Sequence, residues 1–314
     1  MRVLFAGTPD IAVPSLKTLA ASHTVVAVLT NPDKTKGRGR KVMVSHVKEA
    51  ALELDLPLLQ PYKLDADLRD AVAALKPDLL VCIAYGKIFR QVFLDLFPLG
   101  GINLHPSRLP DLRGPSPLNS IILRGDKESA VTVQKLALQM DSGDILLQET
   151  LPITDRETTA TLTEKVAELG AGYLQEVLGK MEEGTISARQ QDHDAATFCS
   201  LIGKNDGLID WQDSAVHLDR IIRAYTPWPH GFSGWNGQRL NILEAHPVAD
   251  RTSDAPPGTV TGMDKKDGIL IQTGEGLLAV TRLQLQSKKP LDFKSFLNGT
   301  KDFIASVLGE IDES

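Results

Sequence analysis

Asn103 and His105 stand two residues apart in the apolar segment GINLH, residues 101–105. In a β-strand, a spacing of two points both side chains to the same face. An asparagine amide donates hydrogen bonds, and a histidine donates or accepts them near neutral pH, so the pair fits oxyanion stabilisation and proton transfer. The alternative explanation is that both side chains only satisfy nearby backbone groups.

Asp141 strengthens the catalytic interpretation. It stands in MDSGD, where Ser142 and Gly143 predict a turn that presents the carboxylate. Such a carboxylate orients an imidazole, and the three side chains together suit acyl transfer to an amine, in which the carbonyl oxygen becomes anionic and a proton moves between nitrogens. An amine is itself a competent nucleophile, so this chemistry requires no covalent intermediate. Asp144 is a competing carboxylate that turn chemistry alone also explains.

The elements that must position these residues alternate along the first half of the chain. Continuous apolar segments predict strands at residues 2–7, 25–30, 78–84 and 101–105, and helical spacing predicts helices before residue 19 and at 44–55 and 65–76. This alternation is typical of a Rossmann-like α/β domain with a mostly parallel sheet and helices on both faces. Residues 106–117, rich in Pro and Gly, then form a loop at the carboxyl end of a strand, where ligands bind in such sheets.

The second half predicts a different architecture. Strands are expected at 130–137 and 144–153, and a helix at 161–181. Beyond residue 206, short apolar segments separated by glycine turns predict a smaller β-barrel of the OB-like kind. We therefore expect a catalytic domain at 1–188, a linker at 189–205 and a C-terminal domain at 206–314.

Composition narrows the function classes. The net charge of -6 argues against binding nucleic acid with the whole surface. No segment is typical of a signal peptide or a membrane span, so we expect a cytoplasmic protein. Only Cys82 and Cys199 are present, which predicts neither a disulfide framework nor a metal site, and Cys82 in an apolar strand is expected to be a buried small hydrophobe.

One basic segment stands out from this acidic background. Residues 31–41, NPDKTKGRGRK, include Arg38, Arg40 and Lys41, with Gly37 and Gly39 allowing close approach to a phosphate backbone. A charged loop in solvent is the alternative. The position of the segment between a strand and the next helix, close to the expected site, favours a functional role.

Two other classes of protein fit less well. A nucleotide-dependent oxidoreductase is disfavoured because FAGTPD, residues 5–10, lacks the G-x-G-x-x-G spacing. A noncatalytic RNA-binding protein would leave the grouping of Asn103, His105 and Asp141 unexplained.

Four motifs in order carry a specific resemblance: FAGTPD, GRGRK at 37–41, INLHPSRLPDLRGPSP at 102–117 and MDSGDIL at 140–146. With them the chain resembles the methionyl-tRNA formyltransferase family, within the folate-dependent formyltransferase superfamily, over nearly its whole length. The resemblance implies that 10-formyltetrahydrofolate is the formyl-donor substrate and that no metal takes part. It also implies that Asn103 and His105 bind the formyl oxygen, while Asp141 assists proton transfer toward N10 of the folate.

The same resemblance implies where the folate binds. Ser107, Arg108, Leu109 and Pro110 match the family's Ser-Leu-Leu-Pro loop, with Arg108 in place of the first leucine. The pterin edge is expected against the backbone of residues 81–85 and 137–141, so Tyr85 and Gly86 join the expected folate-binding residues.

The implied acceptor is initiator methionyl-tRNA, whose product is N-formylmethionyl-tRNA for translation initiation. In the family the basic loop enters the major groove of the acceptor stem, and its important arginine matches Arg38; Arg40, Lys41 and Lys204 are the further expected tRNA-binding residues. The C-terminal domain is expected to hold the outer part of the tRNA, and the protein to act as a monomer away from membranes. A nucleotide-linked amino sugar remains the alternative acceptor, since relatives in the superfamily formylate one.

Overall fold

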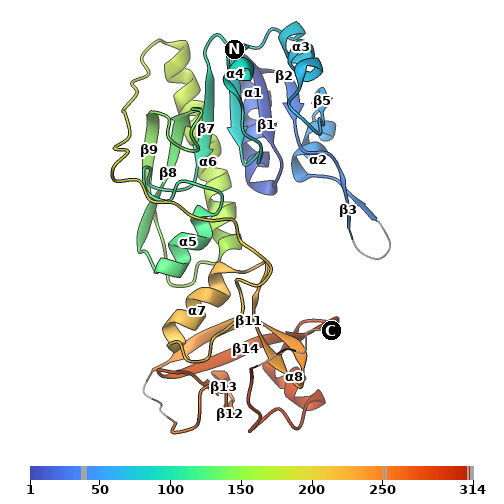
Figure 1. The fold of residues 1–314 in the computed structure, drawn as a ribbon, viewed down its shortest axis with the longest axis vertical. Coiled ribbons are helices and arrows are strands. Elements are labelled where there is room, and N and C mark those ends of the chain that lie inside the picture. Colours follow the sequence, from blue (N-terminus) through green and yellow to red (C-terminus); the bar gives the residue numbers. More distant parts are fainter. Residues whose placement is uncertain (37–40, 250, 252, 310, 312–314) are drawn as a thin grey trace. The chain divides into compact units, whose positions relative to one another are not determined.

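A computed structural model describes residues 1–36, 41–249, 251, 253–309 and 311. The chain divides into two compact units (Figure 1). The first comprises Met1–Pro117, Glu128–Ile153 and Leu162–Ser200, and the second comprises Leu118–Lys127, Thr154–Thr161 and Leu201–Ser314. Each unit has its own sheet.

The first unit is built on a seven-stranded sheet in the order β5-β2-β1-β6-β7-β8-β9. The pairs from β5 to β7 are parallel, whereas β8 pairs antiparallel with both β7 and β9. The predicted mostly parallel sheet is thus confirmed. The elements of the first unit are β1 (Arg2–Gly7), η1 (Asp10–Ala12), α1 (Val13–Ser22), β2 (Thr24–Leu29), β3 (Lys34–Lys36), β4 (Lys41–Met43), α2 (His46–Glu53), β5 (Leu58–Leu59), α3 (Ala66–Ala74), β6 (Leu79–Ile83), α4 (Gln91–Leu94), β7 (Gly101–His105), β8 (Glu128–Lys135), β9 (Ile145–Pro152) and, from residue 162 onward, α6 (Thr159–Glu182).

Helices begin where a polar side chain satisfies a free backbone N–H. Ser45 accepts from the N–H of Lys48 at the start of α2, and Asp65 accepts from the N–H of Leu68 at the start of α3. These caps fix the points at which the chain turns from loop to helix between the parallel strands.

The two faces of the sheet are distinguished by the alternation of side chains. Leu4 of β1 belongs to a buried cluster with Leu68 and Val72 of α3. Leu104 of β7 packs so closely on Gly170 of α6 that a side chain at Gly170 would overlap it. Because neighbours in a strand point to opposite faces, Asn103 and His105 point away from the face that Leu104 shares with α6. Cys82 is buried, as its apolar context predicts.

The second unit contains an antiparallel sheet in the order β10-β11-β14-β13-β12, with β15 paired to β14. The C-terminal segment runs between the outer strands, since Gly309 forms a bridge with Gly234 of β10 and Val307 forms one with Thr259, next to β12. These bridges join the two edges of the sheet, as in a barrel. The elements are α5 (Pro117–Arg124, apart from its first residue), α7 (Ala215–Ala224), β10 (Gly231–Trp235), β11 (Gln238–Val248), β12 (Val260–Asp264), β13 (Gly268–Gln272), β14 (Leu277–Leu285), β15 (Leu291–Asp292) and α8 (Phe293–Gly299).

Within the part of the chain that the structure describes, none of the helices combines the length and the apolar character needed to cross a membrane.

Candidate active site

A row of buried polar side chains crosses β7 and β8. In the antiparallel register Asn103 lies opposite Gln134, and His105 lies opposite Thr132. All four are buried, although the strands around them are otherwise largely apolar. Buried polar groups are stable only with hydrogen-bond partners, so this row must be explained by its contacts.

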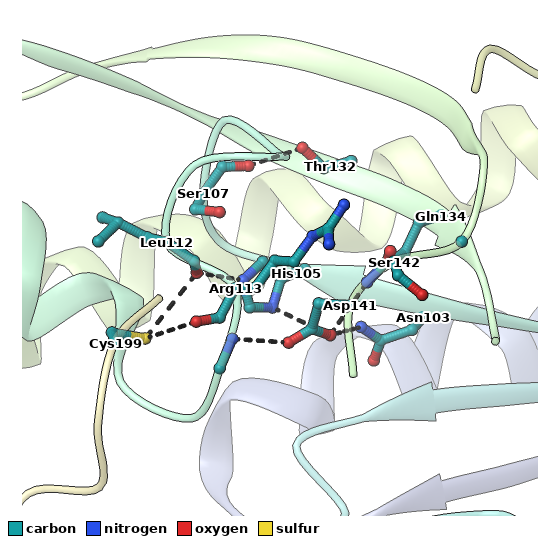
Figure 2. Close-up of polar contacts among 12 residues, drawn as sticks. Asn103, His105, Ser107, Leu112, Arg113, Thr132, Gln134, Asp141, Ser142 and Cys199 are labelled. Atoms are coloured by element: carbon teal, nitrogen blue, oxygen red, sulfur yellow. Dashed lines mark hydrogen bonds and ion pairs between the residues drawn. The ribbon is translucent and has the colours of Figure 1, made fainter. Parts of the chain in front are cut away.

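Asp141 supplies the central contact. It lies in the connection between β8 and β9, with a left-handed φ of 53°. Its Oδ1 accepts a hydrogen bond from Nε2 of Gln134 at 3.0 Å, and its Oδ2 accepts one from the backbone N–H of Gly114 at 2.9 Å. The carboxylate is therefore held from β8 on one side and from the loop after β7 on the other (Figure 2).

Asn103 and His105 converge on the same carboxylate oxygen. Nδ2 of Asn103 lies 3.5 Å from Oδ1 of Asp141, and Nδ1 of His105 lies 3.6 Å from it (Figure 2). Both distances exceed those of strong hydrogen bonds, which are near 2.9 Å. Both groups therefore keep hydrogen-bonding capacity for another oxygen, such as that of a substrate carbonyl.

The loop after β7 determines which nitrogen of His105 faces the carboxylate. Nε2 of His105 lies 2.9 Å from the carbonyl oxygen of Leu112. A carbonyl oxygen only accepts, so Nε2 is the donor and carries a hydrogen. If Nδ1 also carries a proton, the ring is an imidazolium that faces the Asp141 carboxylate. If Nδ1 carries no proton, it and Oδ1 of Asp141 are two acceptors that face each other. Nδ1 is thus the ring nitrogen that faces Oδ1 of Asp141.

Side chains from a later segment enclose this group. Oε1 of Gln191 accepts from Nε and Nη2 of Arg113 at 3.1 and 2.8 Å, and Arg113 also contacts Nδ1 of His193 at 2.9 Å. Burial lowers the pKa of Arg113, and nearby Asp141 acts in the opposite direction. Arg113 remains a cation, because the guanidinium group does not deprotonate in proteins.

Gln134, Gln191 and Gly114 belong to the site but were not predicted from the sequence. Gln134 carries a usable signal, since it shares a face with Thr132 in an otherwise apolar strand segment. Gln191 stands in a polar stretch that gives no periodic signal, and its partners are distant in sequence.

The segment matched to the family's folate loop is largely turned inward. Ser107 is fully buried, and its hydroxyl donates to the carbonyl oxygen of Asp111 at 2.6 Å. Leu109 is also buried, whereas the guanidinium of Arg108 reaches the start of β8, with Glu128 and the carbonyl oxygen of Ser129 each at 3.1 Å. Pro110 is half-buried. Neither Ser107 nor Leu109 therefore presents surface to a ligand in this structure.

Tyr85 follows the same pattern. Its side chain is buried in the core and stacks on Phe89 with ring centroids 5.6 Å apart, while its carbonyl oxygen accepts from Nδ2 of Asn31 at 2.8 Å. Gly86 follows with a left-handed φ of 79° and directs the chain out of the strand end. Tyr85 as a whole is 1% exposed, so its part in a pterin slot stays a prediction.

A cleft of about 450 Å³ lies beside these residues and is lined in part by Leu94, Gly101, Leu136, Ala137 and Leu138. Gly101 shares a face of β7 with Asn103 and His105, by the period of two. Residues 136–138 lead directly to Asp141. The cleft thus opens on the same face of the sheet as the polar group.

The expected tRNA-binding residues are less completely described. Arg38 and Arg40 lie outside the described residues. Lys41 is the first residue of β4, which pairs antiparallel with β3, and its side chain is likewise outside the described part. Lys204 is exposed in a turn of the second unit.

Comparison with known proteins agrees with this geometry. Residues 1–178 match the formyl transferase family, and residues 201–301 match the C-terminal domain of formyl transferases. Fold and site therefore define a formyl transferase. Methionyl-tRNA formyltransferase of Treponema denticola is 46% identical over 97% of this chain and 98% of its own length, and that of Treponema pallidum is 45% identical over 98% and 99%. The chain belongs to the methionyl-tRNA formyltransferase family.

A more distant similarity concerns the fold alone. The crystal structure of HypX from Aquifex aeolicus in complex with tetrahydrofolic acid matches with a TM-score of 0.66 and 18% sequence identity, over 97% of this chain and 48% of HypX. The chain spans about half the length of HypX.

Proposed function

We propose that this protein transfers the formyl group of 10-formyltetrahydrofolate to the amino group of methionine on initiator methionyl-tRNA, which gives N-formylmethionyl-tRNA and tetrahydrofolate. The convergence of Asn103 and His105 on one oxygen of Asp141 carries the proposal. Two donors and one carboxylate are the groups that the attack of an amine on a formyl carbon requires.

The chemistry follows from the three side chains. The methionyl nitrogen attacks the formyl carbon, and the formyl oxygen becomes an anion that Nδ2 of Asn103 and protonated Nδ1 of His105 stabilise. The attacking nitrogen passes a proton to the Asp141 carboxylate, which returns it to N10 as the bond between N10 and the formyl carbon breaks. One amide is formed, one is broken, and the protein ends in its starting protonation state.

The cleft beside the polar group supports the assignment of the folate. A flat heterocycle with alternating donors and acceptors suits a slot whose walls offer backbone groups, and Ala137 and Leu138 line the cleft. Ile88, Leu138 and Met140 have exposed apolar side chains and are close in sequence to, or among, the residues that line the cleft. They offer apolar surface for the rest of the folate. HypX, which shares this fold, forms a complex with tetrahydrofolic acid.

The choice of acceptor is supported by the family and by the basic segment. Relatives with 45–46% identity over nearly the full length are named methionyl-tRNA formyltransferase. The last residue of the GRGRK sequence, Lys41, begins β4, which pairs with β3. We assign Arg38, Arg40, Lys41 and Lys204 to the tRNA, with contacts to phosphates rather than to bases.

The organisation and setting belong to the same proposal. Residues 1–188 carry the catalytic side chains, residues 189–205 link the domains and include side chains that enclose the site, and 206–314 bind the body of the tRNA. The protein acts as a monomer in the cytoplasm and needs neither a membrane nor a metal.

Formylation assays with purified protein test this function. Charged initiator tRNA, free methionine and a sugar-nucleotide amine are each supplied with 10-formyltetrahydrofolate. We expect rapid formylation of the tRNA alone. Equal use of the three amines, or no use of the tRNA, would contradict the proposed acceptor.

A further inference from the structure

Gln191 occupies the centre of the hydrogen bonds that surround Asp141. It is 3% exposed. Its Nε2 donates to the carbonyl oxygens of Gly143 at 2.6 Å and Asp141 at 2.9 Å, and it lies 3.1 Å from Oε1 of Gln134. We infer that Gln191 is a positioning residue, which holds the carboxylate of Asp141 where Asn103 and His105 meet it. The inference rests on the proposed catalytic role of Asp141.

The orientation of the Gln191 amide is fixed by its neighbours. A guanidinium only donates, so the side facing Arg113 must be the oxygen. Backbone carbonyls only accept, so the side facing Gly143 and Asp141 must be the NH₂ group. The two hydrogens of that group serve three acceptors, the carbonyl oxygens of Gly143 and Asp141 and Oε1 of Gln134, so one hydrogen is shared.

Two separate arms lead from Gln191 to the carboxylate. Through Nε2 it contacts Gln134, whose own Nε2 donates to Oδ1 of Asp141. Through Oε1 it holds Arg113, and the next residue, Gly114, donates its N–H to Oδ2 of Asp141. Gln191 thus acts on both carboxylate oxygens without touching either.

The backbone of Asp141 receives the same support. Its left-handed φ of 53° is uncommon for a residue with a side chain, although aspartate adopts it more readily than most, and contacts around the turn stabilise it. The hydrogen bonds from Gln191 to the carbonyls of Asp141 and Gly143 span this part of the turn. Ser142 adds a bond from its hydroxyl to the carbonyl oxygen of Gln139 at 3.0 Å.

The segment that carries Gln191 is itself anchored to the site. Arg189 and Ile145 exchange backbone hydrogen bonds of 2.8 Å, which attach the segment to the start of β9. Further on, Thr197 bonds with Asp111, and the N–H of Cys199 donates to the carbonyl oxygen of Arg113 at 2.8 Å. Residues 189–199 follow the segment that matches the formyl transferase family, residues 1–178. They therefore complete the active site.

Two substitutions separate positioning from mere packing. Gln191→Glu keeps the size of the side chain and an oxygen for Arg113, but places its second oxygen against two carbonyl oxygens. Gln191→Met keeps the length and removes all the hydrogen bonds. We expect both to lower kcat by about 10²-fold, the effect of misplacing a catalytic group by about 1 Å, with little change in KM for either substrate.

The matched control is Gln272→Met in β13. Gln272 is also buried, and its Nε2 donates to the carbonyl oxygen of Thr273 at 2.8 Å, but it belongs to the second unit. We expect this variant to lose some stability and to keep its kcat.

A double-mutant cycle with Asp141→Asn gives the decisive measurement. If Gln191 acts through Asp141, the double variant Gln191→Met with Asp141→Asn has about the kcat of Asp141→Asn alone. The inference would be overturned if the two substitutions lowered kcat independently, so that their effects multiplied in the double variant. It would also be overturned by an unchanged kcat in Gln191→Met or by loss of folding in both Gln191 variants. Full activity of Asp141→Asn alone would instead overturn the proposed role of Asp141, so the two failures are distinguishable.

Discussion

His105 donates through Nε2 to the carbonyl oxygen of Leu112 at 2.9 Å, which leaves Nδ1 as the nitrogen that faces Asp141. The loop that follows β7 therefore selects the reactive nitrogen of a histidine that the strand supplies. The same loop delivers the N–H of Gly114 to the other side of the carboxylate. Loop 106–116 thus sets both the protonation pattern of His105 and the position of Asp141.

Asn103→Ala tests the oxyanion role of the amide. Nδ2 of Asn103 makes only a 3.5 Å contact with Asp141, so its bonding capacity is available to the formyl oxygen. Loss of one such donor lowers kcat by about 10²- to 10³-fold. Rapid-mix assays at saturating substrates measure this, and folate binding should persist. Asn298→Ala, at an exposed position of α8, is the control. An Asn103→Ala enzyme with unchanged kcat would refute the role.

Gly143→Ala tests how tightly the Asp141 turn must pack. A Cβ at Gly143 would overlap the carbonyl oxygen of Lys135, so the turn or the end of β8 must move. We expect a loss of about 1–3 kcal/mol in the free energy of unfolding and a lower kcat, because Asp141 is two residues away. Guanidinium unfolding followed by circular dichroism, together with steady-state kinetics, measures both effects.

Gly172 offers a matched control for this substitution. It is exposed on α6, and among the described residues no heavy atom beyond its chain neighbours and the nearby backbone of its own helix lies within 4 Å of an added Cβ. Gly172→Ala should raise the free energy of unfolding by about 0.5–1 kcal/mol, because alanine favours the helix, and leave kcat unchanged. Equal kcat for the two alanine variants would contradict a tightly packed turn.

Arg38→Ala tests the basic segment. The substitution should raise KM for methionyl-tRNA and leave folate binding unchanged, since phosphate contacts depend on Lys and Arg. The slope of the logarithm of tRNA affinity against the logarithm of salt concentration should fall by about one unit. Arg69→Ala, in α3, controls for the loss of one positive charge. Equal weakening of tRNA and folate binding would show that the segment has another role.

The sequence predicted those features that depend on local patterns. The continuous apolar strands, the loop after β7 and the shared face of Asn103 and His105 all follow from periodicity and from Pro and Gly. The antiparallel direction of β8 and the pairing of β3 with β4 were not predicted, because strand direction depends on partners distant in the chain. The helix α5 was also not predicted, since the proline-rich residues before it mask its start.

The residues of the site also divide into those that local sequence patterns indicate and those that depend on contacts with distant parts of the chain. In the sequence, Asp141 is identifiable from its predicted turn, and Gln134 is identifiable as a polar residue in an otherwise apolar strand segment. Gln191 is not identifiable in this way, because its role exists only through contacts with residues 48 to 78 positions away. The inward direction of Ser107 and Leu109 also escapes sequence patterns, since a loop has no periodicity to indicate which side chains are buried.

His230 should make the second unit less stable in acid. Burial, and to a smaller extent the Arg239 guanidinium, lower the pKa of His230 from its ordinary value of 6.5. Its Nδ1 is enclosed and has no hydrogen-bond partner among the described residues. Below pH 6.5 the unfolded chain therefore binds a proton that the folded chain does not, so the free energy of unfolding falls as the pH decreases from 6.5 toward the folded-state pKa.

His230→Asn removes this titration, and asparagine tolerates the left-handed φ of 70° at that position. Trp211, Trp228 and Trp235 all lie in the second unit, so tryptophan fluorescence during denaturant unfolding reports on that unit. Between about pH 7.5 and 5, we expect a smaller loss of stability in His230→Asn than in the parent protein. Identical losses in both proteins would mean that His230 titrates alike in the folded and unfolded states.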